Sequence, residues 1–196
     1  LFRAALVTQA NARVLARSDA SGAVMALLDS NTPVKIIGSK GNWKMIQSPN
    51  GLDVWVWRKF IDERGATATI NRNRVRIRSR PSTAETSDVL GTLDSGTNVT
   101  VVGHKDDWAR LRMFGAVSGW IDSSQVMTLP TVSDDWRTRW ASAQELATDR
   151  ATKRLEAELD AKKAEADNLA SQQELLDLQN GLTAYYEGAY SKAYRF

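Results

Sequence analysis

The chain contains two copies of one sequence pattern, and an internal repeat of this kind constrains the fold more than any other feature. LDSNTPVKIIGSKGNW at residues 28–43 aligns with LDSGTNVTVVGHKDDW at residues 93–108, at a constant offset of 65. The match continues without a gap through Trp55 in the first copy and Trp120 in the second. The repeat predicts two modules of similar fold, followed by a remainder that has no counterpart.

Upstream of this block the two copies match again at a smaller offset. An offset of 61 aligns Arg13 and Arg17 with Arg74 and Arg78, so the second copy carries four more residues in its first loop. Loops tolerate changes in length at little cost in free energy. This alignment makes Arg74 and Arg78 repeated positions, which we expect to have a structural role within each module.

Each module has the pattern of a small all-β domain. Apolar and polar residues alternate around Val34 and Ile36, and again around Val99 and Val101. Short β-branched and aromatic runs separated by Gly, Asn, Asp and Ser are typical of strands joined by tight turns. Five such runs in about 60 residues suit a small barrel, whose core is marginally stable alone. We expect the two barrels to pack as a pair.

The second copy resembles the bacterial SH3 (SH3b) family. VRIRSRPS at residues 75–82 is followed by LDSGT, a Trp and the pair Gly119 and Trp120, as in that family. The first copy departs from the pattern, because it lacks the Pro, and because Asn31 and Val54 stand where the family has Gly. The resemblance implies SH3-like barrels and a binding role, although the same barrel serves many binding roles.

The resemblance covers roughly residues 6–128 and leaves the last third of the chain unassigned. We therefore expect a mainly β fold with an α extension, in which two small SH3-like barrels in tandem precede a long helix or helical hairpin. The predicted domains are a first barrel at residues 1–64, a second barrel at 65–130, a helical segment at 131–180 and an aromatic tail at 181–196.

The third segment has strong helix propensity. From Thr131 to Asn180 it contains neither Pro nor Gly, and Ala, Leu, Glu, Lys, Arg, Asp and Gln dominate. Ser133 before two Asp residues is a plausible helix start, and Asn180 before Gly181 a plausible stop. One continuous helix competes with a hairpin that turns near residues 167–168, and we favour the continuous helix.

The end of the chain is rich in aromatic residues. All four Tyr lie in the last twelve residues, which end in Phe196. Aromatic clusters favour buried interfaces, so we expect this tail to pack on the barrels, on a second copy or on a partner protein. Together with the two Trp residues at the helix start, the candidate assembly residues are Trp136, Trp140, Tyr186, Tyr190, Tyr194 and Phe196.

Five Arg residues occupy every second position from 72 to 80. On a strand this period would place them all on one face, where guanidinium groups suit carboxylates or phosphates. Because Arg74 and Arg78 align with the first copy, the other members are the better candidates. The predicted anion- or partner-binding residues are Arg72, Arg76, Arg80 and Arg112. Their anion could equally be the chain's own acidic segment, whereas nucleic acid is disfavoured, since no aromatic residues interleave with the row.

The Trp residues of the modules are candidates for both packing and ligand contact. Trp55 and Trp120 are repeated positions, for which packing is the first interpretation. Trp57 has no counterpart, because Asp122 occupies the matching position, so it indicates a contact unique to one copy. The candidate aromatic contact residues are Trp57, Trp55 and Trp120.

The composition disfavours catalysis. The chain has no Cys and a single His, His104, so neither a Cys–His pair nor a His-rich metal site can form, and only one base is available to a catalytic triad. Adjacent carboxylates such as Asp106 and Asp107 point apart on a strand. We expect no catalytic residues, no metal, no cofactor and no enzymatic activity, and we interpret His104 as a surface turn residue.

The charge distribution suggests where partners bind. Residues 1–132 hold 17 Lys and Arg against 11 Asp and Glu, while residues 133–196 hold 9 against 12. No apolar run reaches the length of a transmembrane span, although peripheral membrane contact stays open. We predict a periplasmic or extracytoplasmic protein, its signal peptide removed, that acts as a non-catalytic adaptor or structural subunit for protein partners and possible self-association. The alternative is a peptidoglycan-binding module.

Overall fold

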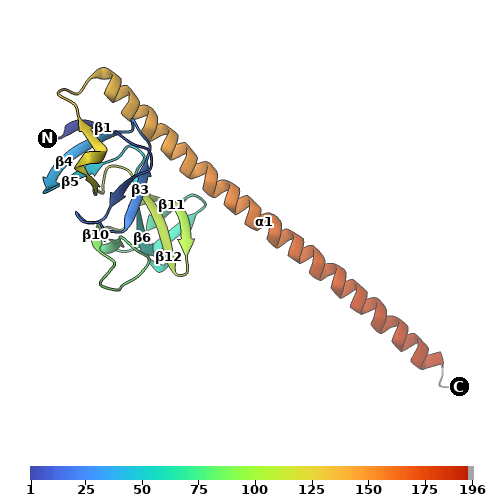
Figure 1. The fold of residues 1–196 in the computed structure, drawn as a ribbon. Helices are drawn as coiled ribbons and strands as arrows, with labels where there is room; N and C mark the ends of the chain where they lie inside the picture. Colours follow the sequence, from blue (N-terminus) through green and yellow to red (C-terminus); the bar gives the residue numbers. More distant parts are fainter. Residues whose placement is uncertain (194–196) are drawn as a thin grey trace. The chain divides into compact units, whose positions relative to one another are not determined.

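A computed structural model describes residues 1–193, with side chains for residues 1–153 and 156–187. Its strands form two antiparallel seven-stranded sheets, and one helix follows them (Figure 1). The first sheet has the order β14-β1-β4-β5-β13-β2-β3 and the second β10-β9-β6-β12-β11-β8-β7. The first contains β1 (Arg3–Val7), β2 (Ala12–Leu15), β3 (Val24–Leu28), β4 (Pro33–Lys40), β5 (Trp43–Gln47), β13 (Gly119–Asp122) and β14 (Val126–Thr128). The second contains β6 (Leu52–Trp57), β7 (Ile61–Arg64), β8 (Thr67–Ile70), β9 (Val75–Arg78), β10 (Val89–Leu93), β11 (Asn98–Lys105) and β12 (Trp108–Met113).

The sheets are open. Each hydrogen-bonded order runs from one edge strand to another, β14 to β3 and β10 to β7, so the predicted closed barrels are not found. The prediction of mainly antiparallel β structure followed by a long helix is confirmed. Buried side chains of both sheets, including Val14, Ile46, Val56 and Leu111, belong to one hydrophobic core. The two repeats therefore share their core instead of building one each.

The closing strands of the two repeats are exchanged between the sheets. β6 belongs to the first repeat but pairs with β12, where Trp57 lies opposite Trp108. β13 belongs to the second repeat but pairs with β5, where Asp122 lies opposite Trp43. As a result the second sheet is one contiguous segment, residues 52–113. The strand pairings thus do not follow the predicted division at residues 64 and 65.

Gly119 allows β13 to lie next to β2 in the first sheet. A Cβ atom on Gly119 of β13 would overlap Cγ1 of Val14, on the neighbouring strand β2. A side chain at this position would therefore require Val14 to shift. Val54, at the matching position of the first repeat, is fully buried in the second sheet.

The register of the sheets corrects the upstream alignment of the repeats. Ala12 pairs with Leu28 in the first sheet, and Val75 pairs with Leu93 in the second. Since Leu28 and Leu93 match at the offset of 65, Ala12 corresponds to Val75, and the upstream offset is 63 instead of 61. A shift of two residues keeps every side chain on the same face, so the alternation pattern cannot distinguish the two alignments.

The helix α1 (Asp134–Ala193) is continuous through the described residues. The oxygen Oγ of Ser133 accepts a hydrogen bond from the Trp136 amide at 3.2 Å, which caps the predicted start. The hairpin alternative is wrong, and so is the predicted stop at Gly181, which lies inside the helix. One Gly costs about 1 kcal/mol relative to Ala, which good helix formers on both sides offset.

The start of the helix is anchored to the first sheet. Trp136 is only 3% exposed, and its Nε1 donates a hydrogen bond to the Ala5 carbonyl at 3.1 Å. Its ring stacks on Phe2 at 5.8 Å and on Trp140 at 5.4 Å between centroids. Lys35 Nζ lies 4.2 Å from the centroid of Trp140. Residues 1–156 form one compact unit and residues 157–196 a second.

Candidate binding site

Most of the predicted arginine row lines one cavity of the second sheet. The cavity has a volume of about 350 Å³. One wall is aromatic and comes from β6, the short 3-10 helix η1 (Arg58–Phe60) and β12, while the other wall comes from residues 72–78. We call this cavity the aromatic–arginine pocket. Its lining residues of interest are Trp57, Phe60, Trp108, Arg72, Arg74, Arg76 and Arg78.

The aromatic wall exists because of the strand exchange. Trp57 and Trp108 stack with their centroids 6.4 Å apart, and Phe60 meets Trp57 edge-on at 6.0 Å. Lys59 Nζ lies 3.6 Å from the Trp57 centroid, a cation–π distance. Trp57 is still 38% exposed, so part of its ring remains accessible beside these contacts. The first sheet has no such wall, because Asp122 lies opposite Trp43 there.

The sequence predicted that the arginine row lies on one face of a strand, and this prediction is wrong. β9 begins only at Val75, and Arg74 has φ of 55°, in the left-handed region that interrupts a strand. The Asp94 carboxylate accepts a hydrogen bond from the Arg74 amide at 3.0 Å and stabilises this turn. The side chains nevertheless gather at the pocket. Among the described residues, neither Arg72 nor Arg76 forms an ion pair.

Arg80 has a structural contact instead of a place in the pocket. Its guanidinium donates to the Thr86 carbonyl at 3.2 Å and to the Ser21 carbonyl at 3.4 Å. By the corrected offset Arg80 corresponds to Arg17, which pairs with Asp88 at 2.7 Å. The hydrogen bond with Asp88 is the main reason that the pKa of Arg17 is raised. Arg17 and Arg80 thus each reach from one repeat into the other.

The corrected offset also changes which arginines are repeated. Arg76 corresponds to Arg13, whereas Arg74 and Arg78 correspond to Asn11 and Leu15. Asn11, like Arg74, has a positive φ, of 56°. Arg78 donates to the Ser87 carbonyl at 3.1 Å.

Arg112 lies in a different cluster. Its Nε and Nη2 donate to the two carboxylate oxygens of Asp53 at 2.8 and 3.0 Å. Arg110 Nε lies 3.8 Å from the same carboxylate, and its guanidinium lies 5.9 Å from the Trp55 centroid. Trp120, the counterpart of Trp55, lies opposite Met45 and Leu15 in the first sheet. Neither Trp55 nor Trp120 lines the aromatic–arginine pocket.

The candidate assembly residues fall in two places. Trp136 and Trp140 lie against the first sheet, as described above. Tyr186 lies on the part of α1 between residues 157 and 187, which we call the distal helix, and is 58% exposed. Tyr190 is helical, but only its backbone is described. Tyr194 and Phe196 lie outside the described residues.

His104 is not a residue of a surface turn. It lies on β11, half-buried, and its Nε2 lies 2.8 Å from Oε2 of Glu63. Glu63 also pairs with Arg58 at 3.2 Å. The described residues contain no group of three acidic, His or Cys side chains that could hold a metal ion. No helix among them combines the length and the hydropathy that a membrane span needs.

The sequence interpretation missed Phe60 and Trp108 as residues that line the pocket. Phe60 corresponds to Gln125 at the offset of 65, so the same test that selected Trp57 would have found it. Trp108 is a repeated residue, and no local signal separates it from Trp43. Its place in the pocket depends on the long-range pairing of β12 with β6.

Part of the chain matches a known domain family. Residues 73–127 match the model of the bacterial SH3 domain, a domain that binds peptidoglycan or proteins. The matched segment contains strands of both sheets, β9–β12 of the second and β13 and the start of β14 of the first. No protein of curated function matches the sequence.

Two solved structures were also compared with the chain. NlpC2 from Trichomonas vaginalis is 12% identical, with a TM-score of 0.20 over 68% of this chain and 51% of that chain. NlpC1 from Trichomonas vaginalis is 14% identical, with a TM-score of 0.19 over 69% and 50%. The chain thus spans about half the length of each. These TM-scores are too low to inform the fold or the function.

Proposed function

We propose that this protein is a non-catalytic adaptor of the bacterial cell envelope, which captures an acidic segment of a partner protein at the aromatic–arginine pocket. The observation that carries the proposal is the meeting of Arg72 and Arg76 with the partly exposed Trp57 around one cavity. Guanidinium groups bind carboxylates, and the accessible part of the Trp57 ring would contact an apolar part of the same segment.

The distal helix supports a role in assembly. Between residues 157 and 187 its large apolar side chains are all exposed within the unit to which they belong, including Leu169, Leu178 and Tyr185. An isolated helix in water is marginally stable, and burial of such side chains against another surface stabilises it. We infer that this segment contacts a second copy or another subunit.

The second candidate function is binding of peptidoglycan. The match of residues 73–127 to the bacterial SH3 domain favours it, since such domains bind peptidoglycan as well as proteins. The peptide stems of the cell wall carry carboxylates, and these would satisfy the same arginines.

One capture experiment separates the two functions. Purified full-length protein is incubated with isolated peptidoglycan and, separately, with envelope proteins from which peptidoglycan has been removed. The adaptor function predicts capture of a defined protein and no sedimentation with peptidoglycan. The double variant Arg72→Ser and Arg76→Ser should lose this capture, while Arg139→Ser on the helix serves as the matched control. Sedimentation with peptidoglycan that the double variant abolishes would establish the second function in its place.

A further inference from the structure

A second, larger cavity lies apart from the aromatic–arginine pocket. Its volume is about 600 Å³, within the range of ligand-binding pockets. It is lined by the edge strand β3, by residues 50–53 at the start of β6, by β12 and by residues 143–150 of α1. All of these belong to the compact unit of residues 1–156. We call it the β3–α1 pocket.

The apolar part of this pocket is exposed. Leu27 on β3 and Leu146 on α1 are 59% and 54% exposed, respectively, and Val24 is exposed beside them. These side chains come from different elements and line the same cavity. An apolar group bound there would remove all three from water.

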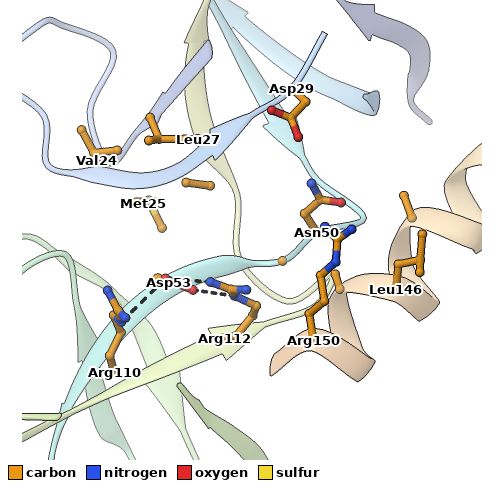
Figure 2. A pocket seen from close by; sticks show the side chains of 14 residues that line it. Val24, Met25, Leu27, Asp29, Asn50, Asp53, Arg110, Arg112, Leu146 and Arg150 are labelled. Carbon is orange, nitrogen blue, oxygen red and sulfur yellow. Dashed lines mark hydrogen bonds and ion pairs between the residues drawn. The ribbon is translucent and has the colours of Figure 1, made fainter. Parts of the chain in front are cut away.

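The polar part contains more positive than negative charge. Three guanidinium groups, of Arg110, Arg112 and Arg150, face two carboxylates, of Asp29 and Asp53. Arg112 occupies both oxygens of Asp53, which leaves Arg110 Nε at 3.8 Å, beyond hydrogen-bond distance (Figure 2). This Nε is buried and has no hydrogen-bond partner among the described residues. A buried donor without an acceptor is costly, so the chain leaves the Arg110 guanidinium incompletely satisfied at this pocket.

Arg150 supplies another guanidinium to the pocket. It extends from the helix toward Asn50, on the opposite wall (Figure 2). Among the described residues Arg150 forms no ion pair. The excess of one positive charge suits a single carboxylate, whereas Asp29 and Asp53 would repel a polyanion such as nucleic acid.

We propose that the β3–α1 pocket is a second binding site, which takes one acidic side chain flanked by apolar residues in an extended protein segment. The carboxylate would bind Arg110 and Arg150, and the flanking side chains would pack on Leu27 and Leu146. This site goes beyond the proposed function, because it shares no lining residue with the aromatic–arginine pocket.

The test uses the full chain and two capped pentapeptides. One has a central glutamate between two leucines, and the other has glutamine in place of the glutamate. We expect the glutamate peptide to bind about tenfold more tightly, with NMR shifts at Leu27 and Leu146. Arg150→Glu should abolish this preference. Arg139→Glu makes the same charge change on the same helix outside the pocket and should preserve it.

Three results would overturn the proposal: equal affinity for the two peptides, equal effects of Arg150→Glu and Arg139→Glu, or no shifts at Leu27 and Leu146 at millimolar peptide. The double variant Arg72→Ser and Arg76→Ser should leave peptide binding unchanged. Loss of binding in that variant would assign the peptide to the aromatic–arginine pocket instead, so failure of this inference is distinguishable from failure of the proposed function.

Discussion

Trp57 stacks on Trp108 at 6.4 Å, although the two residues belong to different copies of the repeat. The contact follows from the pairing of β6 with β12, and it forms half of the aromatic–arginine pocket. The pocket is therefore a property of the exchanged pair of repeats and not of either repeat alone.

Fragments cut at the repeat boundary should not fold separately. Residues 1–64 lack β13 and β14 of the first sheet, and residues 65–156 lack β6 and β7 of the second. We expect each fragment alone to be largely unfolded by circular dichroism, and a refolded equimolar mixture to recover the β-sheet spectrum as a one-to-one complex. The uncut fragment 1–156, which is the whole compact unit and keeps Trp136, is the control. Two fragments that fold independently would contradict the exchange.

Arg80 and Arg72 should behave differently when replaced by serine. Arg80→Ser removes hydrogen bonds to two carbonyl groups and should lower the free energy of unfolding by about 0.5–1.5 kcal/mol. Arg72→Ser should change it by less than about 0.5 kcal/mol, as for other surface sites, while it weakens capture of the partner and its dependence on salt. Urea unfolding and capture across a salt series measure the two effects. The assignment fails if Arg72→Ser proves the more destabilising change.

Replacement of Trp136 should loosen the start of the helix. Trp136→Ala removes a buried ring and its hydrogen bond to Ala5, so we expect a loss of about 3–5 kcal/mol in unfolding free energy. Trp136→Phe keeps a ring and should cost about 1 kcal/mol for the hydrogen bond, together with some packing. Limited proteolysis near residue 133 reports the loosening directly. Similar stability of the alanine variant and the native protein would argue against this anchor.

Deletion of residues 181–196 should leave both sheets folded, since their last strand ends at Thr128. We expect the same deletion to abolish complex formation, because it removes Leu182 and the whole aromatic tail. Circular dichroism and light scattering of the isolated and complexed protein measure the two outcomes. Wild-type complex formation by the truncated chain would show that the tail is dispensable and would favour the peptidoglycan-binding function.

Asp122 should make the free energy of unfolding depend on pH in the acidic range. Its side chain accepts hydrogen bonds from the hydroxyl and the amide of Ser124, and these lower its pKa below the ordinary 3.8. A carboxyl with a lowered pKa in the folded state stabilises the protein above 3.8, and this contribution is lost as the pH falls through the folded pKa. Ser124→Ala should move the pKa of Asp122 upward and reduce the acid-dependent loss. NMR titration of Asp122 would contradict this if the pKa did not rise.

Local sequence patterns determined the elements of this protein. Alternation identified the strands, continuous helix propensity identified α1, and Ser133 marked its start. The mismatch of Trp57 with Asp122 also marked a real difference between the two sheets. The strand, helix and capping signals depend on residues that are neighbours along the chain, where periodicity and capping act directly. The mismatch at Trp57 comes instead from comparison of the two repeats.

Only the tertiary structure decided which sheet receives each closing strand. Trp55 and Trp120 lie in equivalent strands with the same apolar alternation, so either pairing satisfies the local sequence. The same period of two hid the true offset of 63 and made the arginine row appear to be a single strand face, although the turn at Arg74 interrupts it. Strand pairing joins residues that are distant in the sequence, and contacts such as that of Gly119 with Val14 select one arrangement only when the whole core assembles.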